Sequence, residues 1–130
     1  ITLYPDKMIM DDLHILRHRS HFMYLNYPLA HSIIDYITEF ESNYKCVPSV
    51  EDENINKYIK EKFIKFCKNV SLSNESWNEF IELYKKSMLL NGEAYIIIHK
   101  IRRPLSKFKT TFNLIDPDRV FTPVDKRDLK

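Results

Sequence analysis

The sequence predicts an α+β fold, with about four helices followed by a small antiparallel sheet made of a β-hairpin and a third strand. Two observations support this prediction. Apolar residues recur every three or four positions as far as residue 91, and beyond Gly92 they alternate as they do in strands. Gly92 is also the only glycine among 130 residues, and glycine is the residue that most often ends a helix. The length suits a single domain over residues 1–130.

Pro28 divides the first two predicted helices. The first covers residues 8–25, and its apolar face is formed by Ile9, Leu13, Leu16 and Met23. Because proline is well tolerated in the first helical turn, we expect Pro28 to begin the second helix after a cap at Asn26 or Tyr27. That helix has a strong amphipathic pattern, which is typical of a helix with one face against a core. Its apolar stripe consists of Leu29, Ile33, Ile37, Phe40 and Tyr44.

Two further helices precede Gly92. Ser49 and Asp52 resemble a capping pair for the third, because a helix often begins with a hydroxyl residue and an acid three positions later. Its apolar face consists of Ile55, Ile59, Phe63, Phe66 and Val70, with lysines on the other side. After a polar break at 71–74, the fourth helix is expected over residues 75–90. Its buried stripe consists of Trp77, Phe80, Ile81, Tyr84 and Met88.

The strands follow Gly92. Residues 94–98 are a run of β-branched and aromatic residues, which indicates a buried strand. Residues 107–114 alternate between apolar and polar side chains, which indicates a half-buried strand antiparallel to the first. Asp116-Pro117-Asp118 predicts a turn, and residues 119–124 are expected to form the third strand.

Composition excludes several classes of protein. With one glycine the chain has no glycine-rich phosphate loop, so it is neither a Walker-type nucleotide hydrolase nor a dinucleotide-binding protein. No apolar run approaches the roughly twenty residues of a membrane span, so no membrane contact is expected. Cys46 and Cys67 lie in unrelated contexts and are expected to be free thiols of a reducing compartment.

Charge is distributed in blocks of one sign. Residues 35–56 carry six acids and one lysine, residues 57–70 carry five lysines and one acid, and residues 94–115 carry five basic residues and no acid. Such blocks favour contacts with complementary charged surfaces. The candidate contacts to a neighbouring subunit or to DNA phosphates are Arg102, Arg103, Lys107 and Lys109 in the basic hairpin, with Arg17 and Arg19 in the first helix. A DNA contact of this kind would be insensitive to sequence, and the alternative is a solvated hairpin whose lysines protect a sheet edge.

Enzyme chemistry has little support in the sequence. His14, His18 and His21 follow Asp11 at helical spacing and could converge on a metal ion, but Arg17 and Arg19 place positive charge in the same stretch. A G-x-S-x-G nucleophile elbow is impossible with one glycine, and adjacent acids on exposed segments do not make a carboxylate mechanism. We therefore expect no catalytic residues, no cofactor and no resident metal, with the three histidines as a weak alternative metal site.

Three segments resemble portal proteins of tailed bacteriophages. Residues 27–35, YPLAHSIID, are similar to the N-P-x-A-x-x-x-I-D helix start of that family, with Tyr27 in place of the usual asparagine. Residues 89–96, LLNGEAYI, resemble its L-x-G-x-A-Y passage from helix to strand, and residues 114–120, LIDPDRV, its L-x-P-x-x-V segment. The three segments follow one another in the family's order, and the resemblance extends over residues 10–124.

This resemblance implies a structural role. Portal subunits assemble, usually as dodecamers, into a ring at one capsid vertex, through which double-stranded DNA is packaged and ejected. The chain would be an N-terminal part of the wing region, located in the virion after assembly in the host cytoplasm. The full-length protein would contact capsid protein, terminase and the head-tail adaptor, and the ATPase belongs to the terminase.

The resemblance also assigns structural jobs to particular residues. Gly92 would permit the turn from helix to strand, Tyr95 and Ile97 would pack the sheet on the helices, and Asp116-Pro117 would form the next turn. Pro28 belongs to the first motif.

Two other interpretations stay open. The chain could be a stand-alone α+β interaction module that binds an acidic partner, or a metal-dependent enzyme that uses the histidines. Because the sequence begins at Ile1 without an initiator methionine, we also expect it to be an excerpt of a longer polypeptide.

Overall fold

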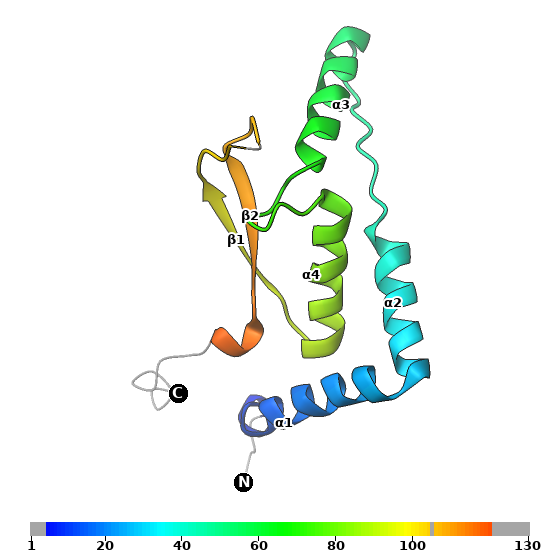
Figure 1. Cartoon of the computed structure of the whole chain (residues 1–130), viewed down its shortest axis with the longest axis vertical. Coiled ribbons are helices and arrows are strands. Elements are labelled where there is room, and N and C mark those ends of the chain that lie inside the picture. Colours follow the sequence, from blue (N-terminus) through cyan, green and yellow to red (C-terminus); the bar gives the residue numbers. More distant parts are fainter. Residues whose placement is uncertain (1–4, 105, 121–130) are drawn as a thin grey trace.

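Four helices precede a two-stranded antiparallel sheet, which confirms the predicted α+β fold (Figure 1). The computed structural model describes the backbone of residues 5–104 and 106–120, and side chains from residue 12 onward within these ranges. The elements are α1 (Pro5–Asn26), α2 (Pro28–Ser42), α3 (Glu53–Cys67), α4 (Trp77–Asn91), β1 (Tyr95–Lys100), β2 (Thr110–Ile115) and the 3₁₀ helix η1 (Pro117–Arg119).

Helix α4 lies at the centre of the arrangement (Figure 1). Helix α2 packs along one side of α4, and α1 runs across one end of this pair and contacts both helices. The sheet lies on the other side of α4. Helix α3 extends beyond the opposite end of α4 and touches it only slightly, so α3 is the helix with the least support from the rest of the chain.

Local signals in the sequence explain where the helices begin and end. Pro28 occupies the first turn of α2, after Tyr27 in an extended conformation. The cap of α3 is Asp52, whose Oδ1 accepts from the backbone nitrogen of Asn54 at 2.8 Å, so the predicted capping role of Ser49 is wrong. Asp52 prevails because its carboxylate reaches the free N–H groups of the first turn directly.

Helix α4 has the most complete ends. The Ser76 hydroxyl accepts from the backbone nitrogen of Glu79, and the Glu79 carboxylate accepts from the backbone nitrogen of Ser76, which forms a capping box. At the other end Gly92 has φ of +78° and donates its N–H to the carbonyl of Met88 at 2.9 Å. This left-handed conformation confirms the predicted role of Gly92, because residues with a Cβ adopt it only at a cost.

Strands β1 and β2 pair from Tyr95 opposite Ile115 to Lys100 opposite Thr110. Ile98 lies opposite Phe112, and the Phe112 ring stacks on Phe80 of α4 with centroids 5.6 Å apart. Directly opposed residues share a face of a sheet, so Ile96 and Ile98 lie on the face that carries Phe112, and Tyr95 and Ile97 lie on the other face. All four side chains are exposed, Ile98 most of all at 67%, so Tyr95 and Ile97 do not pack closely on the helices as the resemblance implied.

The second edge of β2 is covered by a segment that precedes α4. Phe112 donates its N–H to the carbonyl of Val70 at 2.8 Å, and Leu72 donates to the carbonyl of Phe112 at 3.0 Å. The third strand that was expected over residues 119–124 is not seen among the described residues. Arg119 belongs to η1 and Val120 is not in a strand, whereas residues 121–124 lie outside the described residues.

The core is small and rich in aromatic rings. Its buried apolar side chains are Val70, Phe80 and Leu90. Around them an aromatic cluster joins α3, α4, β2 and the hairpin, and its members are Phe63, Phe66, Trp77, Phe80, Phe108 and Phe112. In α4, Phe80 is buried as predicted, whereas Trp77 is half-buried and Met88 is exposed.

The apolar stripe of α2 is turned to solvent, which the sequence did not indicate. Phe40 is 75% exposed and Leu29 is 73% exposed, whereas Thr38 is completely buried and Ser42 nearly so. The two buried hydroxyls donate within α2, to the carbonyls of Asp35 and Glu39, and so need no other partner. Their small volume lets the backbone of α2 come close to α4, because the distance between packed helices depends on the side chains between them.

Phe80 and Phe40 allow a matched test of this arrangement. We expect Phe80→Ala to lower the free energy of unfolding by about 3–5 kcal/mol, because it opens a cavity beside Phe112 in a small core. Phe40→Ala removes the same atoms from an exposed position and should change it by less than about 0.5 kcal/mol. Urea denaturation of both variants at low protein concentration measures the difference, and equal losses would contradict the described orientation of α2.

Candidate functional site

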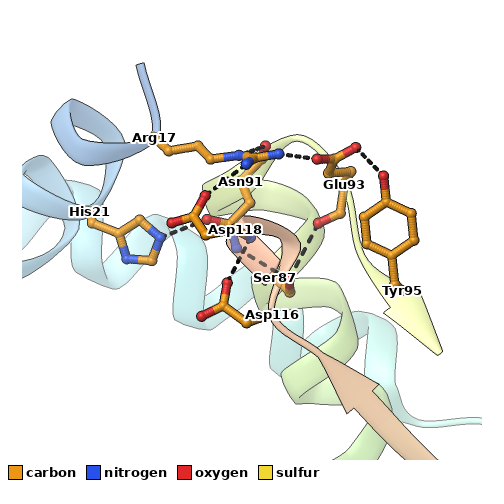
Figure 2. Close-up of polar contacts among 8 residues, drawn as sticks. All are labelled: Arg17, His21, Ser87, Asn91, Glu93, Tyr95, Asp116 and Asp118. Atoms are coloured by element: carbon orange, nitrogen blue, oxygen red, sulfur yellow. Dashed lines mark hydrogen bonds and ion pairs between the residues drawn. The ribbon is translucent and has the colours of Figure 1, made fainter. Parts of the chain in front are cut away.

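Arg17 is the centre of a polar cluster that joins α1 to the end of α4, to the start of β1 and to η1 (Figure 2). Its Nη2 donates to Oε1 of Glu93, its Nη1 donates to Oδ1 of Asp118 at 2.7 Å, and its Nε donates to the carbonyl of Asn91 at 3.4 Å. Arg17 is 8% exposed, so α1 places a charged residue where its sequence pattern would place an apolar one. The ion pairs compensate the burial of that charge.

The partners of Arg17 are held by contacts of their own. Tyr95 donates its hydroxyl to Oε2 of Glu93 at 2.7 Å, and this hydrogen bond raises the pKa of the Tyr95 phenol. Ser87 donates to the carbonyl of Glu93 at 3.3 Å, so the turn at Gly92 is tied back to α4. The Asn91 carbonyl lies at the C-terminus of α4, where the guanidinium also complements the negative end of the helix dipole.

The predicted turn at Asp116-Pro117 is present and positions the second carboxylate. Oδ1 of Asp116 accepts from the backbone nitrogen of Asp118 at 3.0 Å, which caps η1, and Pro117 is buried in its first turn. The turn directs Asp118 toward Arg17 across the end of the sheet (Figure 2). Asp116 and Pro117 therefore act through the geometry of the turn.

These contacts change how the candidate residues of α1 are assigned. Arg17 is engaged inside the fold and leaves the set of cations that could meet a neighbouring subunit or DNA. Arg19, two residues further on, is exposed and stays in that set. Sequence reasoning missed the role of Arg17 because its acidic partners lie 76 and 101 residues away.

The cations of the basic hairpin also differ in whether they are engaged inside the fold or exposed. Arg103 Nη1 donates to Oδ1 of Asn69 and to the carbonyl of Ser71, and Nη2 donates to the carbonyl of Asn69 at 2.9 Å. Arg103 thus fastens the hairpin to the segment between α3 and α4 and is not a surface contact. Arg102, Lys107 and Lys109 are exposed and remain candidates for one.

The structure brings the two basic blocks of the sequence together. Phe108 of the hairpin packs against Phe66 near the end of α3, with ring centroids 5.4 Å apart. The hairpin therefore meets the C-terminal end of α3. The exposed lysines of α3 are Lys57, Lys60, Lys62 and Lys65, and Lys68 follows the helix directly. The sequence analysis treated the two basic blocks separately. Phe108 and Phe112 lie on the same side of the alternating segment 107–114, and this indicated that the segment packs against an apolar surface.

The three histidines of α1 lie beside the Arg17 cluster. His14, His18 and His21 line an open pocket of about 660 Å³ together with Arg17 and Asn91. His21 Nε2 is 2.7 Å from Oδ1 of Asn91, which engages that ring in a hydrogen bond. In the part of the chain that the structure describes, no three His, Cys, Asp or Glu side chains are arranged to hold a metal ion, so the alternative metal site has no geometric support.

A second polar group connects α1, α2 and α4. Tyr24 donates to Oδ1 of Asp35 at 2.8 Å, Lys86 Nζ lies 2.9 Å from the same oxygen, and His31 stacks on the Tyr24 ring. Hydrogen bonds from Lys86 and Tyr24 lower the pKa of Asp35. A further ion pair, Lys85–Glu41 at 2.8 Å, also links α4 to α2. These contacts hold α2 in the orientation that buries Thr38.

Other features of the sequence are also located. Cys46 and Cys67 are free thiols, as predicted, and burial raises the pKa of Cys67. Among residues 5–104 and 106–120, no helix combines the length and the apolar character that a membrane crossing needs.

No protein-family model matches the chain, and no curated protein sequence matches it significantly.

Replacing Arg17 tests whether the cluster stabilises the fold. We expect Arg17→Met to lower the free energy of unfolding by about 1.5–3 kcal/mol, the range for hydrogen bonds to charged groups. Arg17→Lys keeps the charge but not the three-way geometry, so its loss should be intermediate. Arg19→Met removes an exposed guanidinium from the same helix and serves as the control. Urea denaturation that gave equal values for Arg17→Met and Arg19→Met would contradict the structural role of the cluster.

Asp35 predicts a pH dependence of stability. Because its pKa is lower in the folded chain than in the unfolded chain, the ionised carboxylate stabilises the fold above the ordinary aspartate pKa of about 3.9. This contribution is lost as the pH falls through the lowered pKa. Thermal unfolding of the unaltered chain and of Asp35→Asn should therefore differ most at neutral pH and converge in acid. Glu39→Gln is the control, and a difference that persists at pH 2 would contradict the prediction.

Proposed function

We propose that this chain is a structural part of a portal subunit, which assembles into a ring at one capsid vertex of a tailed bacteriophage. The observation that carries the proposal is the convergence of the three portal-like segments on α1. In the segment 27–35, His31 and Asp35 contact Tyr24. In the segments 89–96 and 114–120, Glu93 and Asp118 bind Arg17. Segments far apart in the sequence thus form one structural unit.

The individual motif residues support the same proposal. Pro28 begins α2, Gly92 ends α4 in a left-handed conformation, and Asp116-Pro117 forms the turn after β2. Each residue type is used for its backbone geometry. This use of the motif suits a protein that acts by holding a shape, which is what a ring subunit does.

The exposed surface supports a role in assembly. Many large apolar side chains are exposed on α1, α2, α3 and β1, and an interface would remove such side chains from water. Arg102, Lys107 and Lys109 are exposed at the hairpin. In a ring these cations are available for a neighbouring subunit or for the phosphates of passing double-stranded DNA, a contact that does not read sequence. The proposed location is the virion.

The mass of the assembled complete polypeptide that contains this sequence tests the proposal. We expect a closed ring of about twelve copies by native mass measurement and electron microscopy, since closed point-group symmetry is the rule for homo-oligomers. A monomer that binds an acidic protein would contradict the proposal and favour the interaction module.

Arg102→Glu combined with Lys107→Glu and Lys109→Glu should impair ring assembly or DNA retention. Arg103 is left unchanged in that variant, because it fastens the hairpin.

A further inference from the structure

Residues 43–52, which we call the linker, join α2 to α3 and run beside α3 (Figure 1). Near the start of α3, Asn56 holds the linker with two hydrogen bonds. Its Oδ1 accepts from the backbone nitrogen of Val50 at 3.0 Å, and its Nδ2 donates to the carbonyl of Val50 at 2.7 Å. At the other end of the linker, Oδ1 of Asn43 accepts from Nδ2 of Asn78 in α4 at 3.4 Å. The linker is therefore held at both ends and runs antiparallel to α3.

The antiparallel course brings Cys46 of the linker to the level of Cys67, the last residue of α3. Cys46 precedes Val50 by four positions, and an extended chain covers about 13 Å over that length. The same distance measured from Asn56 along a helix corresponds to about nine residues, which ends near position 65. Side chains of a helix lean toward its N-terminus, so the Cys67 sulfur is directed back toward that level.

Cys67 also lies on the side of α3 that the linker follows. Asn56, Lys60 and Cys67 are separated by four and then seven positions, and this spacing returns to the same side of an α-helix. Asn56 and Lys60 line an open pocket of about 400 Å³ together with Cys46. Both cysteines are half-buried. The two thiols therefore face the same narrow region between the linker and α3.

The electrostatics of the two thiols agree with this placement. Burial raises the pKa of Cys67, and the charge of a Cys46 thiolate raises that pKa further. Such an effect weakens with distance and is screened by salt, so it indicates that the two sulfur atoms are near one another. Because only the thiolate is a nucleophile, the raised pKa also keeps Cys67 in its less reactive thiol form.

We propose that Cys46 and Cys67 form a reversible disulfide by exchange with an anionic low-molecular-weight disulfide such as oxidised glutathione. The Cys46 thiolate attacks one sulfur of that disulfide, which forms a mixed disulfide and releases one glutathione thiolate. Cys67 then gives its proton to water and attacks the Cys46 sulfur, which releases the second glutathione. The two protein thiols are oxidised, the small disulfide is reduced to two thiols, and the protons of the protein thiols pass through water to the glutathione.

The surroundings of Cys46 favour an anionic reagent. Lys57 and Lys60 are exposed and line the same pocket as Cys46. Their positive charge attracts the carboxylates of oxidised glutathione and so raises its concentration at the Cys46 sulfur. A neutral disulfide lacks this attraction, so the two reagents distinguish the role of the lysines from the reactivity of the thiol itself.

The bond would act on the helix that has the least support from the rest of the chain. Helix α3 touches α4 only slightly, and none of its residues is buried. A disulfide between Cys46 and Cys67 closes a loop that contains the whole of α3 and ties the end of the helix to the linker. Closing a loop restricts its open conformations, so oxidation should hold α3 more firmly. This inference does not depend on the proposed function, since it concerns the chain by itself.

Amide hydrogen exchange measures the effect on α3. We expect exchange in α3 to slow by about tenfold or more when the chain is oxidised with glutathione disulfide, whereas exchange in α2, which lies outside the loop, should stay the same. Equal exchange of α3 in the reduced and oxidised chains would show that the bond does not hold the helix.

The two lysines of the pocket have matched controls on the same helix. Lys57→Gln combined with Lys60→Gln should slow the reaction of Cys46 with oxidised glutathione by about threefold and leave its reaction with neutral hydroxyethyl disulfide unchanged. Lys62→Gln combined with Lys65→Gln removes the same charge from other sides of α3 and should change neither rate. Equal slowing by both pairs would overturn the assignment of an anionic reagent to this pocket.

Peptide mapping without reductant tests the bond itself. After equilibration with oxidised and reduced glutathione, we expect a peptide pair that joins Cys46 to Cys67 within one chain, and an intact mass lower by two hydrogen atoms. The equilibrium constant for closing the bond should be at least about tenfold larger in the folded chain than in urea, because the fold holds the sulfurs together. Cys67→Ser should instead accumulate the mixed disulfide at Cys46. Glutathione on both cysteines without the internal bond, or an equilibrium constant no larger than in urea, would overturn the proposal.

Discussion

The arrangement of this molecule depends on one buried guanidinium. Arg17 brings together α1, the end of α4, the entry to β1 and η1, all of which lie at the same end of the structure. The aromatic cluster at the other end joins α3, α4 and β2 through contacts that tolerate sliding and small rotations. The guanidinium does not tolerate them, because its donors are directional and each has a fixed acceptor. Apolar contacts thus hold the elements together, and the Arg17 cluster sets their relative orientation.

The sequence predicted the elements well because their signals are local. Pro28 and Gly92 mark helix boundaries through backbone geometry, and the change of period after Gly92 identifies both strands of the sheet. The prediction was wrong where two local signals competed, as at Ser49 and Asp52, because only the folded geometry shows which side chain reaches the free N–H groups. The segment around Val70, which pairs with Phe112 from 42 positions earlier in the chain, was not predicted to meet the sheet.

The candidate site was less predictable because its contacts are distant in sequence. Arg17 and Arg103 look like surface cations in a one-dimensional pattern, yet both act inside the fold on partners that no nearby residue reveals. The stripe of α2 shows the reverse error. Its periodicity correctly indicated an amphipathic helix, but the buried side is made by Thr38 and Ser42, whose small polar side chains carry no weight in such a pattern. A hydrophobic stripe identifies a surface that avoids water, and it does not say whether the same chain provides the cover.

The separation of Arg17 from Asp118 also has a consequence for biosynthesis. The two residues are 101 positions apart, and a ribosome that adds 5–20 residues per second needs about 5–20 s to make the intervening chain. During that interval α1 has emerged while the acceptors of its guanidinium do not yet exist. The α2–α4 pair can dock earlier, since Asp35 and Lys86 are both made well before Asp118. Helix α1 is therefore synthesised before the other described elements and is among the last of them to be fixed in place.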